Sequence, residues 1–260
     1  MKTVILCGGM GTRLREETEY RPKPMVEIGG RPILWHIMKL YAHYGCSDFV
    51  LCLGYRADLI KSYFLNYQTH TTDFTIRLGS SPELRFHGNH LESDWRITFA
   101  DTGVEVSTGA RVKRIQHYVS DDTFMLTYGD GVADIDIRRL LEFHRSHGRI
   151  ATVTGVRPPS RFGELKMRDD QVIQFSEKPQ TSEGFINGGF FVFNKEVFDY
   201  VSDDPSCLLE RAPLEALAEQ GELKVYTHTG FWQCMDTSRD LQRLRELWET
   251  ATPPWKVWNS

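Results

Sequence analysis

The sequence predicts an α/β fold with a mixed, mostly parallel central sheet that is flanked by helices. The first observation is the apolar run over residues 4–7, which is typical of a strand buried on both faces and is followed directly by glycines. The second is the alternation that comes after it: a helix-period apolar stripe over residues 33–41, an apolar strand over 48–54 and a short helix over 56–65. Strands and helices that alternate in this way favour crossover connections between parallel strands.

The loop after the first strand has the composition of a phosphate-binding loop. It contains Gly8, Gly9, Gly11, Thr12 and Arg13, and Lys23 follows it. Glycines let backbone N–H groups approach a phosphate that a Cβ would keep away. Two known phosphate loops are excluded, because no glycine precedes Lys-Ser or Lys-Thr and the spacing G-x-G-x-x-G fails at Leu14. We therefore predict a phosphate site of another class, with a tight turn without a ligand as the alternative.

The rest of the chain continues the alternation and becomes more antiparallel in its second half. Strands are predicted over residues 95–100, 123–128, 150–156, 172–175, 190–193 and 224–227, and helices over 110–118, 135–147, 213–220 and 238–250. Residues 66–91 have weak periodicity and scattered histidines, which favours a solvated loop. His144 and His147 are three residues apart on a predicted helix, and without a third ligand we expect a solvated helix face there.

Two isolated aspartates are candidate metal ligands. Asp130 lies between two glycines after the strand over 123–128, at the edge where α/β sheets place ligand-facing groups. Because Mg²⁺ prefers one or two carboxylates together with phosphate oxygens, we expect Asp130 to bind Mg²⁺ beside the phosphate loop rather than to form only a turn. Asp236 precedes the last predicted helix, and from the residues alone an ordinary helix N-cap is the stronger interpretation of it.

Composition limits the class of protein. The chain has 260 residues, 40% of them hydrophobic, which allows one large domain or two small ones with a sizeable core. The net charge of −4 and the lack of a basic stripe argue against a nucleic-acid interface. No run of 18 apolar residues and no signal-peptide pattern occur, and five scattered cysteines fit a reducing cytoplasm. Trp248, Trp255 and Trp258 predict a C-terminal packing tail, with a subunit contact as the alternative.

A two-part motif carries a resemblance to a known family. The segment G-G-M-G-T-R-L at residues 8–14 is followed at fixed spacing by P-K-P-M at 22–25 and G-G-R-P-I-L at 29–34. This pattern resembles the nucleotidyltransferases that join sugar 1-phosphates to nucleoside triphosphates. The sequence of residues 24–38 resembles the cytidylyltransferase branch in particular, and later segments match that branch as well. Cys7 and Met10 replace the usual alanine and leucine, which are small apolar changes.

The resemblance implies a fold and an activity. The fold is Rossmann-like, of the nucleotide-diphospho-sugar transferase type, in one domain with a nucleotide-binding half over about residues 1–150 and a sugar-phosphate half over about 151–260. The activity is transfer of a cytidylyl group from CTP to glucose 1-phosphate with Mg²⁺ as cofactor, giving CDP-glucose and pyrophosphate. The resemblance also implies a homo-oligomer, such as a hexamer, that serves lipopolysaccharide O-antigen biosynthesis. The composition given above adds the expectation of a cytoplasmic protein without nucleic-acid or membrane partners.

The resemblance further assigns roles to individual residues. Arg13 and Lys23 are the expected catalytic residues, with Arg13 on the leaving pyrophosphate and Lys23 on the α-phosphate. The expected nucleotide contacts are Leu6, Cys7, Gly8, Gly9, Met10, Gly11, Thr12, Arg13, Lys23, Thr108, Arg111, Gly129 and Asp130. The expected sugar-phosphate contacts are Gly163, Glu177, Lys178, Ile186 and Asn187, and the expected metal ligands are Asp130 and Asp236. Without the resemblance, Arg111 would be interpreted as a surface charge and Glu177 with Lys178 as a surface ion pair.

Two other functions remain open at this point. Within the same chemistry the base could be uracil or thymine and the sugar could differ, because base choice depends on pocket edges that sequence spacing does not show. In another class, the chain could be a catalytically silent subunit that senses nucleotides on this fold. The presence of Arg13, Lys23, Asp130, Lys178 and Asp236 argues against a silent subunit, because such a homologue is expected to lose some of them.

Overall fold

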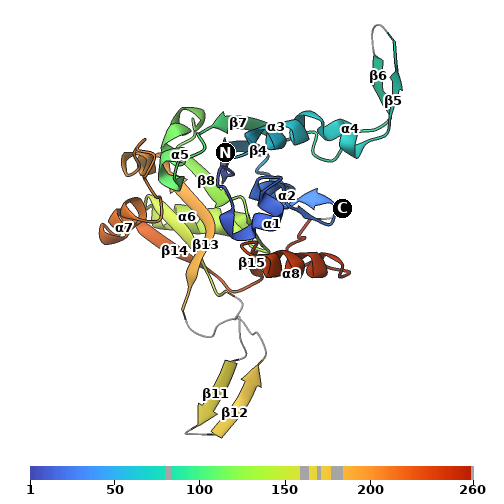
Figure 1. Ribbon diagram of the computed structural model, residues 1–260. Coiled ribbons are helices and arrows are strands. Elements are labelled where there is room, and N and C mark those ends of the chain that lie inside the picture. The colour runs from blue at the N-terminus through green and yellow to red at the C-terminus, as the bar shows by residue number, and fades with distance from the viewer. Residues whose placement is uncertain (80–82, 159–163, 169–170, 177–183, 259–260) are drawn as a thin grey trace.

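The central sheet has the predicted mixed, mostly parallel arrangement (Figure 1). The computed structural model describes residues 1–79, 83–158, 164–168, 171–176 and 184–258. Seven strands follow the order β14-β10-β13-β8-β1-β4-β7, and only β13 runs antiparallel to its neighbours β8 and β10. These strands are β1 (Lys2–Leu6), β4 (Asp48–Leu53), β7 (Arg96–Asp101), β8 (Thr123–Tyr128), β10 (Ala151–Val156), β13 (Ile186–Asn194) and β14 (Leu223–His228).

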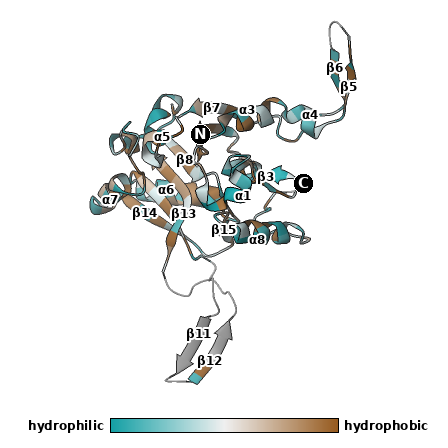
Figure 2. Cartoon of the chain, in the orientation of Figure 1, coloured by the Kyte–Doolittle hydropathy of each residue, from teal (hydrophilic) through white to brown (hydrophobic). Residues whose placement is uncertain are grey.

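The sheet is covered on both faces because its central strands alternate between two apolar cores. In β1, Val4 and Leu6 belong to one core and Ile5 to the other, as the two-residue period of a strand requires. Figure 2 shows the hydrophobic colouring concentrated on these strands. The core that contains Ile5 is covered by α2 (Ile33–His43) and α6 (Ile137–His147), and the other core by α5 (Thr108–Arg114) and α7 (Ala212–Glu219).

The strand directions bring several chain segments to one edge of the sheet. Because β1, β4, β7 and β8 are parallel, their carboxyl ends meet there. The antiparallel strand β13 contributes its first residues to the same edge, since Phe190 pairs with Thr127 near the end of β8. Ile186 and Asn187 therefore start at the edge where the loop after β1 leaves the sheet. This edge is the place where α/β sheets bind ligands.

Shorter elements connect and flank the sheet. They are η1 (Thr12–Leu14), α1 (Arg15–Thr18), η2 (Lys23–Met25), β2 (Glu27–Ile28), β3 (Arg31–Pro32), α3 (Ala57–Leu65), η3 (Gln116–Tyr118), β9 (Gly131–Ala133), η4 (Lys195–Asp199), β15 (Trp232–Cys234) and α8 (Ser238–Trp248). The antiparallel pair β11 (Glu164–Arg168) and β12 (Gln171–Ser176) extends away from the body of the molecule (Figure 1). Among the described residues, no helix has the length and apolar character needed to span a bilayer.

The prediction of a solvated loop over residues 66–91 is wrong. This segment contains α4 (Tyr67–Thr71) and a hairpin of β5 (Phe74–Arg77) with β6 (Glu83–Phe86), which projects from the body on the side opposite β11 and β12 (Figure 1). Each strand has only four residues, so its alternation of apolar and polar side chains is too short to stand out in the sequence.

The prediction of a solvated helix face at His144 is also wrong. His144 is buried, with Nδ1 2.9 Å from the Thr152 hydroxyl and Nε2 3.0 Å from the Asn194 side-chain oxygen. It continues the buried stripe of α6 that begins at Ile137 and Leu140, at spacings of one and two helical turns. Its imidazole thus joins α6 to β10 and β13.

The tryptophan-rich C-terminus is a packing tail, as predicted. Trp255 and Trp258 are buried and lie edge-on to His36 and Trp35 of α2, with Trp258 5.9 Å from Trp35 between ring centroids. His36 is itself buried and its Nε2 lies 2.9 Å from the Ile28 carbonyl oxygen. The tail therefore closes the core that α2 forms with the sheet.

Candidate active site

The glycines of the loop after β1 serve two separate purposes. A Cβ on Gly8 would lie 2.1 Å from Nη1 of Arg111, so only glycine fits above that side chain. Gly11 has a φ of 64°, in the left-handed region that favours glycine, where the chain turns into η1. Gly9 and Gly11 line a cavity at the carboxyl edge of the sheet. The loop is therefore closed on its inner side and open toward the cavity, which suits backbone contact with a phosphate.

Arg111 is buried beneath this loop and supports it. Only 3% of the residue is exposed, so its interpretation as a surface charge is wrong. Its guanidinium donates to the carbonyl oxygens of Leu53, Gly8, Gly103 and Val104 and to the Thr102 hydroxyl, at 2.7–3.1 Å. Burial lowers the pKa of Arg111. The five acceptors tie the ends of β1, β4 and β7 together.

A lysine between two aspartates forms the charged centre of the cavity. Lys23 Nζ lies 2.6 Å from Asp130 Oδ2 and 2.5 Å from Asp236 Oδ1. Arg13 approaches the same cluster from solvent, with Nη1 2.9 Å from Asp236 Oδ2. Burial opposes the charge on Lys23, but Asp130 and Asp236 outweigh it and raise the pKa of the ammonium. The structure thus brings together all four residues to which the sequence assigned catalysis or metal binding.

The carboxylate of Asp236 is free for this cluster because it is not a helix cap. Thr237 caps α8, and its hydroxyl accepts from the backbone N–H of Asp240. The Asp240 carboxylate in turn accepts from the backbone N–H of Thr237 at 2.9 Å, which completes a capping box. The N-cap interpretation of Asp236 is therefore wrong by one residue.

The two aspartates are held at a fixed separation by the backbone. Asp130 follows β8, and the Met235 N–H donates to the Asp130 carbonyl oxygen at 2.8 Å. Next to this bond, β9 pairs antiparallel with β15, with Gly131 opposite Cys234. The rigid pairing places two carboxylates that are distant in sequence on the same side of the cavity.

The cavity itself is large enough for a nucleotide and a sugar phosphate together. It has a volume of about 1390 Å³. Of the predicted site residues, it is lined by Leu6, Gly9, Gly11, Thr12, Arg13, Lys23, Thr108, Gly129, Asp130, Ile186, Asn187 and Asp236. Cys7, Gly8, Met10 and Arg111 do not line it, and their nucleotide contacts remain predictions. Gly163, Glu177 and Lys178 lie outside the residues that the structure describes.

A hydrogen-bonded group between α5 and β13 was not predicted from the sequence. Glu210 accepts from the Tyr128 hydroxyl at 2.5 Å and from the Thr108 hydroxyl at 2.6 Å. The Tyr128 hydroxyl also lies 3.3 Å from the Asn187 side-chain nitrogen. Burial and the Glu210 carboxylate raise the pKa of Tyr128. The position of Tyr128 directly before Gly129 and Asp130 was a usable signal, whereas Glu210 lies in a segment without a motif.

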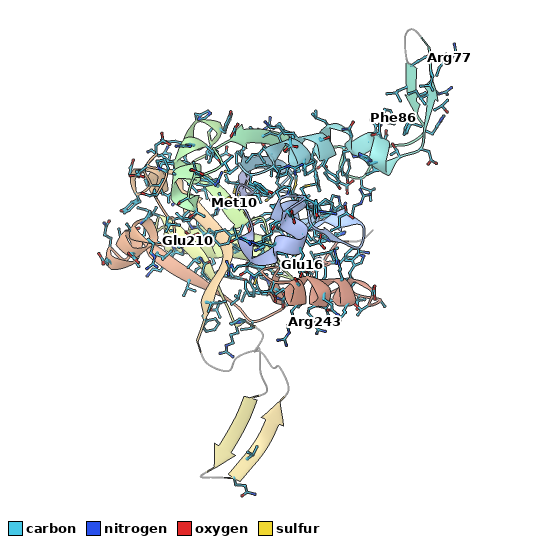
Figure 3. The ribbon with its side chains drawn as sticks, in the orientation of Figure 1. Met10, Glu16, Arg77, Phe86, Glu210 and Arg243 are labelled. Carbon is cyan, nitrogen blue, oxygen red and sulfur yellow. The ribbon has the colours of Figure 1, made fainter. Side chains whose placement is uncertain are left out.

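Two arginines of α8 were also missed. Arg239 and Arg243 line the cavity together with Arg13, and Figure 3 shows Arg243 extending from α8 on the side of β11 and β12. The two residues are four apart and therefore share one helix face, a spacing that sequence analysis could have used. By contrast, Arg77 and Phe86 of the β5–β6 hairpin lie far from this region (Figure 3).

A family model described as nucleotidyl transferase matches residues 2–246. The chain belongs to this family. It is 51% identical over 259 residues to the glucose-1-phosphate cytidylyltransferase of Salmonella typhimurium, which covers 99% of the chain and 100% of the relative. It is 46% identical, at the same coverage, to the probable glucose-1-phosphate cytidylyltransferase of Bacillus subtilis. The resemblance inferred from the two-part motif is thereby confirmed.

Solved structures of other nucleotidyltransferases share the fold. A putative glucose-1-phosphate thymidylyltransferase from Bacillus anthracis superposes with a TM-score of 0.69 at 19% identity, over 97% of this chain and 96% of that one. A UDP-glucose pyrophosphorylase gives a TM-score of 0.66 at 12% identity, over 94% and 97% of the two chains. At such low identity these neighbours establish the architecture of this nucleotidyl transferase and nothing finer.

Proposed function

We propose that this nucleotidyl transferase is a glucose-1-phosphate cytidylyltransferase, which converts CTP and glucose 1-phosphate into CDP-glucose and pyrophosphate. The observation that carries the proposal is the 51% identity over nearly the full chain to an enzyme of that name. The cluster of Arg13, Lys23, Asp130 and Asp236 in one cavity supports it, because phosphoryl chemistry needs groups that stabilise charge at a fixed position.

The reaction is an in-line displacement at phosphorus. A phosphate oxygen of glucose 1-phosphate forms a bond to the α-phosphorus of CTP, and the bond from that phosphorus to the bridging oxygen of the β-phosphate breaks. The attacking oxygen is already ionised, so no general base is required. Both reactants are anions, so the protein must bring them together and offset their repulsion.

Different residues of the cavity would bind the phosphates and offset their charge. The backbone of the loop with Gly9 and Gly11 would hold the nucleotide phosphates. Lys23 would neutralise the charge that develops on the α-phosphate, since its ammonium is already in the cavity and carries a raised pKa. Arg13 would hold the departing pyrophosphate, since its side chain is 75% exposed and reaches the cavity from outside.

Asp130 and Asp236 fit a magnesium site. One oxygen from each lies within 2.6 Å of Lys23 Nζ, so the two carboxylates converge on a single point. Carboxylate oxygens completed by phosphate oxygens are the ligands that Mg²⁺ prefers. When bound there, Mg²⁺ would offset the charge of the phosphates.

The sugar phosphate would occupy the side of the cavity that β13 forms. Ile186 and Asn187 line that side, and Glu177, Lys178 and Gly163 are assigned to it by the family resemblance. In this proposal the nucleotide-binding half is about residues 1–150 and the sugar-phosphate half is about 151–260. The chain forms a homo-oligomer, and light scattering would measure the number of subunits.

The test of the proposed function is pyrophosphate release with glucose 1-phosphate and Mg²⁺, in parallel reactions with CTP, UTP, dTTP and ATP. Release mainly with CTP is the expected result. Release mainly with UTP or dTTP would change the assigned base and leave the assigned chemistry in place. No pyrophosphate release with any of the four nucleotides would overturn the proposal. Arg13→Met should lower turnover by about a hundredfold or more. Arg149→Met is the matched control. Arg149 pairs with Glu222 at the amino end of β10, which is the end away from the cavity.

A further inference from the structure

The position of Lys23 has a consequence for how the enzyme acquires its metal. Its ammonium makes ion pairs of 2.6 Å with Asp130 and 2.5 Å with Asp236, and 12% of its side chain is exposed. A positive charge therefore already occupies the point at which the two expected metal ligands converge. The cavity is lined by these same three residues, so the ammonium stands inside the substrate site and not behind it.

The lysine and a divalent cation compete for the same oxygens. Mg²⁺ sits about 2.1 Å from its ligand oxygens, whereas Lys23 Nζ lies 2.5–2.6 Å from one oxygen of each carboxylate. Both cations cannot hold these positions together, because their charges repel at such separations. One of them must leave before the other binds.

Lys23 is the member of the cluster that is able to move. The aspartates are fixed by the bond between Met235 and the Asp130 carbonyl and by the pairing of Gly131 with Cys234. The Lys23 ammonium is joined to its backbone by four rotatable methylene groups, and its contacts at the tip are limited to the two carboxylates among the described residues. A nucleotide phosphate in the cavity would offer the ammonium another anionic partner.

We propose that Lys23 occupies the metal position while the enzyme is free of nucleotide, and that it vacates this position when a nucleotide phosphate accepts its ammonium. Metal binding and nucleotide binding are then positively coupled through one side chain. The coupling is reciprocal, since each ligand must raise the affinity of the other by the same factor. This inference rests on the proposed function, and it predicts that the free enzyme binds the metal weakly.

The experiment measures binding of Mn²⁺, a paramagnetic substitute for Mg²⁺, to the full chain without nucleotide. Free Mn²⁺ is followed by electron paramagnetic resonance. Lys23→Met should bind Mn²⁺ about tenfold more tightly than the wild-type protein, since the competing charge is gone. Lys39→Met is the matched control: Lys39 also pairs with a carboxylate, Glu92, at 2.9 Å and lies outside the cavity. It should bind Mn²⁺ like the wild-type protein.

A second variant guards against misfolding caused by two unpaired carboxylates. Lys23→Gln keeps a hydrogen-bond donor without the charge, and it should also bind Mn²⁺ more tightly than the wild-type protein. Melting curves establish which variants are folded. Affinity that is equal to or weaker than wild type in a folded Lys23 variant would overturn the exchange. That outcome is separate from the proposed function, which fails only when the wild-type enzyme releases no pyrophosphate.

Discussion

Arg111 provides a decisive test of how the phosphate loop is built. The perturbation is Arg111→Met, which keeps an unbranched side chain of similar bulk and removes the guanidinium. The wild-type side chain makes five hydrogen bonds, to Gly8, Leu53, Thr102, Gly103 and Val104. The carboxyl ends of β1, β4 and β7 lose their common anchor when it is removed.

The magnitude follows from counting which acceptors keep a donor. The Leu53 carbonyl also accepts from the Thr102 backbone and hydroxyl, and the Gly8 carbonyl also accepts from the Tyr55 backbone. The acceptors on Thr102, Gly103 and Val104 have no other donor recorded among the described residues. At about 1 kcal/mol for each net hydrogen bond, the free energy of unfolding should fall by about 3 kcal/mol.

The assay is urea unfolding followed by tryptophan fluorescence, together with calorimetric titration of CTP. Lys113→Met on the same helix is the control, because its ammonium makes one bond, to the Phe198 carbonyl at 2.7 Å. The free energy of unfolding of that variant should fall by about 1 kcal/mol. If Arg111→Met unfolds like the wild-type protein but fails to bind CTP, the supporting role is wrong and a direct nucleotide contact replaces it.

Three further predictions concern other parts of the molecule. Burial lowers the pKa of His36 to about 4, so the unfolded chain takes up the proton first as the pH falls. The free energy of unfolding should then decrease between about pH 6.5 and pH 4, by about 3 kcal/mol at the lower end, and His36→Gln should flatten this slope in urea titrations. Trp255→Ala should lower the free energy of unfolding by about 3–5 kcal/mol, because Trp255 is 1% exposed. An unchanged urea midpoint would contradict the packing described for the tail. Tyr128→Phe should raise the KM for glucose 1-phosphate several-fold, since the lost hydroxyl orients Asn187. It should also lower the free energy of unfolding by about 1 kcal/mol, because the hydroxyl donates to Glu210; an unchanged KM would remove Tyr128 from the sugar side.

Elements with a strong local pattern agree best with their predicted bounds. The strand over 123–128 has the same bounds in the structure, and the helix predicted over 213–220 corresponds to α7, Ala212–Glu219. Such elements carry a strong period over their own length. The β5–β6 hairpin was missed because its strands are short and exposed, and His144 was misjudged because its burial depends on β10 and β13.

The site shows the same division between local and distant information. Gly8, Gly11, Arg13 and Lys23 were identified from residues 8–25 of a two-part motif. The cavity is lined by Gly11, Arg13 and Lys23, and Gly8 packs over Arg111. Glu210 could not be found in this way. It is 82 residues from Tyr128 in the sequence, and no pattern in its own segment predicts the contact between them.

The sequence alone determined the class of fold, the family and the residue types gathered for phosphate chemistry, because each depends on patterns within a few tens of residues. The tertiary structure decided which charges meet. Lys23 is 107 residues from Asp130 and 213 from Asp236, yet its ammonium bridges both. Arg111, which resembles a surface charge in the sequence, is buried under the loop. The physical reason is that strand pairing brings distant segments together at one edge of a sheet, and only there do burial and opposite charge settle what each side chain contacts.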